Sequence, residues 1–158
     1  MASKPSANTE VAEFAGQLFF RLWRASHTRI AEPLESIGLT PPLFGLLNVL
    51  GARDGAIQQE LGSIMGIDRS TMVSLIDELE AAGLAKRRPH LRDRRAREVA
   101  ITPKGRRLLE QGRRMARQVE DEVLSGLTPE ERRQLLGLMR RAFSSAPPQS
   151  PWRAEEGD

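Results

Sequence analysis

The chain has 158 residues, 39% hydrophobic and 28% charged, which is enough for one globular domain with a buried core. It has no cysteine, which excludes disulfides, thiol redox sensing and thiolate metal sites. There is no run of about 18 apolar residues, and the N-terminus lacks a secretion signal. We therefore expect a cytoplasmic protein with no membrane contact.

The net charge of +3 is unevenly distributed along the chain. Residues 1–83 carry a net charge of −4 and residues 118–158 carry −3, whereas residues 84–117 hold 13 Lys and Arg against 3 Asp and Glu, a net of +10. A basic block between two acidic segments indicates a polyanionic partner.

The N-terminal third predicts a flexible start over 1–9 and a long helix over 10–34, which ends near Pro33 and Gly38. The apolar positions of this helix cover more than one face, so it needs burial on two sides, and a second subunit is one way to provide it. These positions are Phe14, Leu18, Phe19, Leu22, Trp23 and Ile30.

Three further helix starts carry the dipeptide Thr-Pro, at Thr40, Thr102 and Thr128. Threonine is a good N-cap, and proline suits the first helical position because its missing N–H is not needed there. At Thr128, Glu131 completes a capping box. The predicted helices cover 40–52, 102–124 and 128–144.

Residues 57–83 contain two short amphipathic segments separated by Gly66, and Asp68 is placed to cap the second. The first turn of that second segment is polar, and apolar residues follow at helical spacing. The pattern predicts a helix-turn-helix, whose second helix enters the DNA major groove. An ordinary helical hairpin packed on a core fits this stretch equally well.

The segment between this motif and Thr102 predicts two short strands, 84–88 and 98–101, joined by an arginine-rich loop. A basic hairpin directly after a recognition helix is typical of a wing. Arginine suits a narrow minor groove because its negative potential favours an inserted cation.

With these motifs in place, the sequence resembles the MarR (multiple antibiotic resistance regulator) family of winged-helix transcription factors over residues 12–143. One departure is Ile57, which stands where the family has a capping Ser or Thr. The resemblance is carried by Leu39-Thr40-Pro41-Pro42, Gln59-Glu60-Leu61, Asp68-Arg69-Ser70-Thr71-Met72-Val73, Leu75-Ile76-Asp77-Glu78-Leu79-Glu80, Gly83-Leu84, Arg87-Arg88-Pro89, Asp93-Arg94-Arg95 and Ile101-Thr102-Pro103-Lys104-Gly105.

The resemblance implies a mainly α fold with a small β-hairpin wing (α+β). A single domain would span 10–144, with a winged helix-turn-helix lobe over 40–101 and dimerisation helices over 10–34 and 102–144. It further implies a homodimer that binds a pseudo-palindromic double-stranded DNA operator, acts mostly as a repressor, and responds to a small aromatic or phenolic ligand. The proline-rich tail 145–158, with an unexplained Trp152, is expected to be disordered.

For base reading we expect Arg69, Ser70, Thr71 and Ser74, although capping or solvation explains Ser70 and Thr71 about as well. In the wing, the family's Asp-x-Arg motif matches Asp93 and Arg95, and this implies that the carboxylate orients an arginine inserted into the minor groove. Further arginines are candidates for phosphate contact, namely Arg87, Arg88, Arg92, Arg94 and Arg97.

An effector cleft is the least defined expectation, because core or interface packing explains each residue as well. Its candidate lining residues are Phe19, Trp23, His27, Phe44 and Leu47. No metal site, cofactor or enzymatic motif is evident. The alternative to operator recognition is a winged-helix module that binds RNA or a protein, but the basic block 84–117 contains no aromatic residue for base stacking, which favours duplex DNA.

Overall fold

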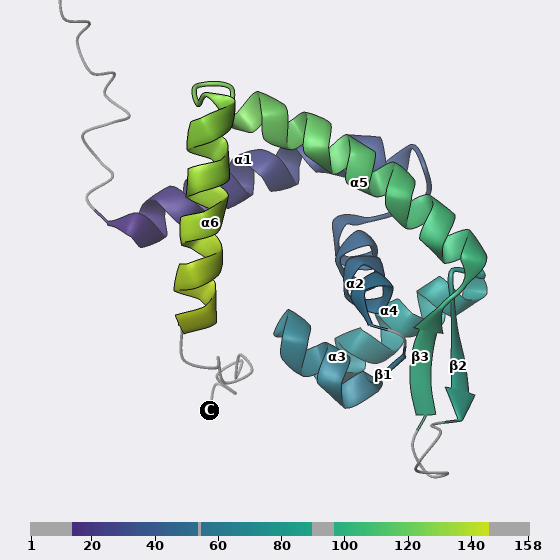
Figure 1. Cartoon of the computed structure of the whole chain (residues 1–158). Helices are drawn as coiled ribbons and strands as arrows, with labels where there is room; N and C mark the ends of the chain where they lie inside the picture. Colours follow the sequence, from purple (N-terminus) through teal and green to yellow (C-terminus); the bar gives the residue numbers. More distant parts are fainter. Residues whose placement is uncertain (1–13, 54, 90–96, 146–158) are drawn as a thin grey trace, which may run out of the picture.

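The computed structural model describes residues 14–53, 55–89 and 97–145. In this part of the chain, six helices accompany a three-stranded sheet, as a mainly α winged-helix fold requires (Figure 1). The elements in order are α1 (Ala15–Glu35), α2 (Pro41–Ala52), β1 (Ala56–Ile57), α3 (Gln58–Met65), α4 (Arg69–Ala81), β2 (Ala85–Pro89), β3 (Arg97–Ile101), α5 (Pro103–Val123) and α6 (Pro129–Ser145).

The elements form two regions (Figure 1). We call α2 through β3 the lobe, and we call α1, the second half of α5, and α6 the arm. Helices α1 and α5 run side by side across the top of the view, and α5 connects the lobe to the arm. None of the helices in the described ranges is long and apolar enough to cross a membrane.

Capping explains where most helices begin. Thr40 and Thr102 each accept a hydrogen bond from a backbone N–H of the first turn that follows, and the Thr128–Glu131 capping box is present. Helix α3 lacks such a cap, because Ile57 has no side-chain acceptor. Only the Glu60 carboxylate reaches back to accept from the Ile57 N–H.

Helix α1 ends within one residue of the predicted boundary. Pro33 lies inside the last turn, and the helix continues to Glu35 even though proline cannot donate to the carbonyl four residues earlier. Gly38 is where the chain leaves the helix, because its φ of +75° reverses the backbone and lets the Leu39 N–H bond to the Leu34 carbonyl. Residues 1–13 and 146–158 lie outside the described residues, so the predicted flexible ends stay predictions.

The hydrophobic core of the described chain is centred on the lobe. It is mostly leucine from the helices and sheet of the lobe, and α1 and α5 add Leu34 and Leu109, so the helix-turn-helix and the wing share one rigid support. Residues with no exposed surface are Leu34, Leu46, Leu47, Leu50, Leu61, Met72, Ile76 and Leu79.

Strand β1 was not predicted. It pairs antiparallel with β3, and β3 pairs with β2, so the predicted hairpin is part of a three-stranded sheet ordered β1-β3-β2. At two residues, β1 is too short to carry a period-two pattern in the sequence. Its pairing anchors the start of α3 to the base of the wing.

Candidate DNA-binding surface

The turn between α3 and α4 has the geometry that the helix-turn-helix pattern predicts. Gly66 ends α3 with a φ of +64°, a left-handed conformation that glycine adopts without steric cost, and the Ile67 N–H bonds to the Gly62 carbonyl. Helix α4 begins at Arg69, three residues after Gly66. Its apolar side, with Met72, Ile76 and Leu79, is fully buried. The polar side at its start therefore faces solvent.

The exposed start of α4 is organised by Asp68. The Asp68 carboxylate accepts hydrogen bonds from the Ser70 hydroxyl at 2.6 Å, the Thr71 hydroxyl at 2.6 Å and the Thr71 N–H at 2.9 Å. These bonds, first that from Ser70, hold the pKa of Asp68 well below its usual range. Two predicted base-reading residues thus also serve as helix-capping partners.

The other two predicted base-reading residues are less constrained. Ser74 is exposed, and its hydroxyl donates to the Ser70 carbonyl at 3.2 Å. Arg69 is exposed, and no hydrogen bond or ion pair of its guanidinium occurs within the described ranges. All four predicted residues therefore lie on the solvent side of the first two turns of α4.

The wing lies beside this surface. Strands β2 and β3 pair from Ala85 opposite Ile101 to Pro89 opposite Arg97, which confirms the predicted hairpin. Arg97 is exposed where β3 begins. The tip, with Arg92, Asp93, Arg94 and Arg95, falls in the range 90–96 outside the described residues, so the roles assigned to these side chains stay predictions.

At the base of the wing, Arg88 pairs with Glu98, its cross-strand neighbour. Glu98 is 6% exposed, and a buried carboxylate requires such a partner. Gly55 packs against the pair with a φ of +89°, and an added Cβ would lie 2.9 Å from the Glu98 carboxylate. The ion pair joins β2 to β3 within the sheet, a structural role that was not predicted for Arg88.

Arg87 braces the wing against α4. Its guanidinium bonds to the carboxylates of Asp77, at 2.7 Å, and Glu80, and its backbone N–H donates to Glu80. Burial alone would lower the pKa of Arg87, but the hydrogen bonds to Asp77 and Glu80 raise it above its ordinary value. The structure thus gives Arg87 an intramolecular role, and its predicted phosphate contact stays a prediction.

A second brace joins α5 to the end of α4. The Lys104 ammonium donates to the Ala82 carbonyl at 2.7 Å, and the Thr102 hydroxyl donates to the Gly83 carbonyl at 2.8 Å. A cation at a helix C-terminus also interacts favourably with the helix dipole. Sequence reasoning missed this contact because its partners are about 20 residues apart, with only the Lys104 charge as a signal.

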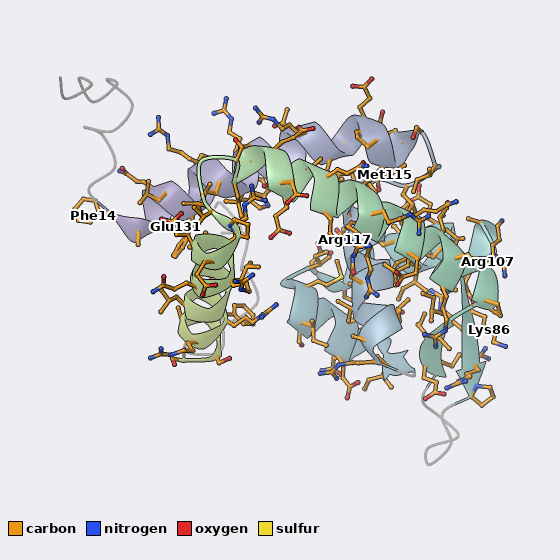
Figure 2. All side chains as sticks on the ribbon, turned by 45° about the horizontal axis from the view of Figure 1, so that its top comes forward. Phe14, Lys86, Arg107, Met115, Arg117 and Glu131 are labelled. Carbon is orange, nitrogen blue, oxygen red and sulfur yellow. The ribbon has the colours of Figure 1, made fainter. Side chains whose placement is uncertain are left out.

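Among the described residues of the basic block, Arg113 is half-buried and bonds to Asn48 and Glu110, whereas most of the other cations are exposed. Figure 2 shows Lys86 and Arg107 at the wing side of the lobe and Arg117 further along α5. Arg106 and Arg114 are exposed as well. The lobe end of α5 is therefore strongly basic, as the distribution of charge in the sequence predicts.

The predicted effector residues fall into two different environments. Leu47 has no exposed surface, and the Phe44 ring packs so closely on Gly112 of α5 that an added Cβ would lie 2.7 Å from it. Trp23 is 57% exposed on α1, and its ring lies 4.9 Å from that of His27. In this conformation, Phe44 and Leu47 serve the packing of the lobe, so the expectation of a ligand cleft stays a prediction.

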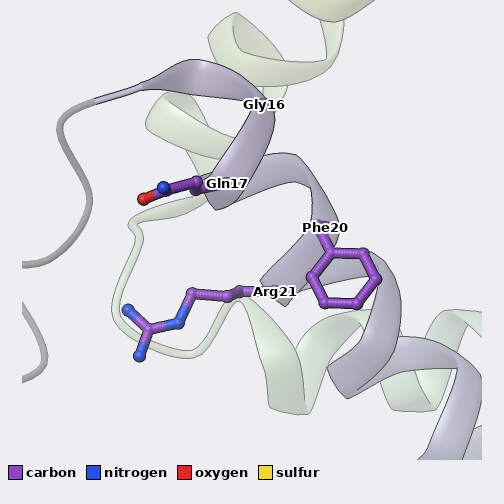
Figure 3. Close-up of a pocket in the computed structure, with 4 residues that line it drawn as sticks. All are labelled: Gly16, Gln17, Phe20 and Arg21. Carbon is purple, nitrogen blue, oxygen red and sulfur yellow. The ribbon is translucent and has the colours of Figure 1, made fainter.

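The arm exposes a large apolar surface. Its exposed aliphatic and aromatic residues come from α1 and α6, and no residue of α6 is buried. Figure 3 shows a shallow pocket on α1 lined by Gly16, Gln17, Phe20 and Arg21, next to this surface. Such a patch on a folded chain indicates a protein interface. The exposed residues are Phe14, Leu18, Phe19, Phe20, Trp23, Leu138, Met139 and Phe143.

Similarity to known proteins agrees with this architecture. Residues 37–96 match a model of the MarR family. A protein of Thauera aromatica, named as a regulator of transcription for the hcr operon, is 32% identical over 146 residues, which is 87% of this chain and 88% of that protein.

Two solved structures extend the likeness. Bordetella bronchiseptica BpsR, in a structure concerned with regulation of its DNA binding by 6-hydroxynicotinic acid, is 27% identical with a TM-score of 0.72, over 87% of this chain and 97% of that chain. A cysteine-to-serine variant of E. coli MarR in complex with operator DNA is 21% identical with a TM-score of 0.70, over 87% of this chain and 99% of that chain. This chain belongs to the MarR family of transcriptional regulators.

Proposed function

We propose that this regulator binds a pseudo-palindromic operator as a homodimer, represses transcription, and is released by a small aromatic ligand. The observation that carries the proposal is the exposed polar start of α4 beside a basic wing, on a lobe that holds α4 by its fully buried apolar side. A helix presented in this way fits the major groove, with its N-terminal residues toward base edges.

The exposed apolar surface of the arm supports dimerisation. A single copy of the chain leaves the apolar faces of α1 and α6 exposed, and a second copy related by a two-fold axis would cover both faces with the same residues. Two lobes held in this way would present two recognition helices to two half-sites. The operator complex of the E. coli relative and the ligand named for BpsR support DNA binding and ligand control in this chain by analogy.

Genomic footprinting of the purified protein tests operator recognition. We expect a small set of promoter sites with inverted-repeat symmetry. If six to ten phosphates are neutralised per dimer, log affinity should fall with log salt concentration at a slope of about −5 to −9. Equal affinity for structured RNA, or no preference among duplexes at any salt concentration, would contradict the proposal.

The wing is tested with Arg95→Ala. We expect weaker operator binding with an unchanged dimer and an unchanged thermal midpoint, since the family resemblance gives Arg95 a contact with DNA. Arg88→Ala is the informative comparison, because Arg88 is paired with buried Glu98 and its loss should lower stability. If Arg95→Ala unfolds the protein instead, the wing tip has a structural role.

A further inference from the structure

Two hydroxyl groups at the start of α4 have a fixed hydrogen-bond polarity. The Ser70 hydroxyl lies 2.6 Å from Oδ1 of Asp68, and the Thr71 hydroxyl lies 2.6 Å from Oδ2 of the same carboxylate. All three residues are exposed, so this end of α4 is open to a binding partner.

The polarity follows from counting hydrogens. An ionised carboxylate can only accept, whereas a hydroxyl has one hydrogen to donate and lone pairs with which to accept. Asp68 is ionised at neutral pH because its pKa is held below the usual range by the bonds from Ser70 and Thr71. Each hydroxyl must therefore direct its hydrogen at Asp68, and only lone pairs remain for a second partner.

Base edges in the major groove distinguish donors from acceptors. The exocyclic amino groups of adenine and cytosine donate, while the O6 of guanine and the O4 of thymine accept. A side chain that can only accept therefore favours an amino base over a keto base at its contact. A free serine or threonine can turn its hydroxyl either way and does not make this choice.

We propose that Asp68 is a positioning residue that fixes Ser70 and Thr71 as acceptors, so that α4 selects adenine or cytosine wherever these hydroxyls meet base edges. The inference rests on the proposed operator binding. It adds a specificity determinant that needs no contact between Asp68 and DNA. Charge-assisted bonds are about twice as strong as neutral ones, which makes this polarity costly to reverse.

Ser74 provides an internal contrast. Its hydroxyl donates at 3.2 Å to the backbone carbonyl of Ser70, a neutral acceptor. This bond is longer than those to Asp68 and lacks charge assistance. The Ser74 hydroxyl can therefore turn toward DNA as a donor or as an acceptor, and we expect no amino-versus-keto preference at its contact.

Asp68→Asn tests the inference because asparagine caps helices as well as aspartate does. The amide oxygen must occupy the Oδ1 position, where it accepts from the Thr71 N–H and the Ser70 hydroxyl. The amide NH2 then replaces Oδ2 and donates to the Thr71 hydroxyl, whose own hydrogen turns outward. The polarity of Thr71 reverses, while that of Ser70 is retained.

Binding-site selection with wild type, Asp68→Asn and Thr71→Val measures the effect. Thr71→Val identifies the base that Thr71 reads, because this variant should lose the base preference at that position of the operator and keep it elsewhere. At that base we expect Asp68→Asn to move the ratio of affinities from amino toward keto bases by about 3- to 10-fold, the size of one net hydrogen bond. Affinity for all duplexes should rise uniformly, since one negative charge near DNA is lost, and this does not change the ratio.

The double variant Asp68→Asn/Thr71→Val is the control and should show no further change in preference at that base. If Asp68→Asn leaves the preference intact, Asp68 is only a helix cap and the inference is wrong. It is also wrong if Thr71→Val abolishes no preference, because Thr71 then reads no base. Failure of operator binding itself would appear already in the wild type, as a lack of any selected sequence.

Discussion

The lobe buries large apolar residues that the arm leaves exposed. In the lobe, Leu46 and Ile76 have no exposed surface, whereas in the arm Trp23 is 57% and Phe143 is 82% exposed. Both regions carry amphipathic helices, so the difference lies in what each helix finds to pack against. Within one chain, the helices of the lobe bury their apolar sides. The apolar sides of the arm helices can be buried only against a second surface, which we propose is another copy of the chain.

The largest expected effect comes from Trp23→Glu in the arm. Trp23 is exposed, and its ring lies against Phe20 and His27 of its own helix, so the change should spare the fold and prevent dimerisation. Loss of the second lobe should weaken operator binding by about 10²- to 10⁴-fold. Sedimentation and duplex titration measure both effects.

Thr28→Glu is the matched control, since Thr28 is exposed on α1 about 140° around the helix from Trp23, given 100° per residue. It should leave dimer and affinity near those of the wild type. A Trp23→Glu protein that remains dimeric would show that this part of the arm is not the interface.

Next in size is Leu46→Ala in the lobe. Removing a fully buried leucine should lower the free energy of unfolding by about 2–5 kcal/mol. The same truncation at Leu138, which is 51% exposed in the arm, should change it by much less at concentrations where the chain is monomeric. Denaturant titrations at several protein concentrations separate the two regions, because only arm variants should show a concentration-dependent difference.

A smaller effect is expected at the junction of the two regions. In Gly105→Ala the added Cβ would lie 2.1 Å from the Leu84 carbonyl oxygen, so α5 must move away from the lobe. We expect a loss of about 1–3 kcal/mol in the free energy of unfolding. Gly137→Ala on α6 meets no atom within 4 Å and should stabilise its helix by up to about 1 kcal/mol. Equal changes in the free energy of unfolding for Gly105→Ala and Gly137→Ala would refute the close packing of Gly105 of α5 against Leu84.

The smallest effect concerns pH and the capping box of the arm. The hydrogen bonds from the Thr128 N–H and hydroxyl lower the pKa of Glu131. The unfolded chain therefore binds more protons in the acid range, so the contribution of Glu131 is present above the usual glutamate pKa and is lost as pH falls through the lowered pKa. Thermal midpoints of wild type and Glu131→Gln, measured between about pH 2 and 6, should differ most near pH 6 and converge below about pH 4, because only the wild type loses this contribution in acid.

Local signals made much of the lobe predictable. The caps at Thr40, Asp68 and Thr102 and the turn at Gly66 act within a few residues, and so they are visible in the sequence. The hairpin could be placed because its two strands flank one loop. Strand β1 could not be predicted, because its two residues form a strand only by pairing with β3, which lies about 40 residues later in the sequence.

The partners of the arginines could not be predicted from the sequence. In the sequence, Arg87, Arg88 and Arg97 are equivalent members of a basic block. In the structure, Arg87 binds Asp77 and Glu80, Arg88 binds buried Glu98, and Arg97 is exposed. Strand register and the position of α4 decide which carboxylate each guanidinium meets, and neither is visible in local sequence.

The sequence by itself determined the order of helices, the position of the recognition helix and the sign of the charge around it, because these depend on short-range periodicity, capping and composition. The tertiary structure alone decided which polar groups are already engaged and which remain for a partner. Hydrogen bonds and ion pairs form between groups that folding brings within about 3 Å, and that proximity depends on the packing of the whole lobe.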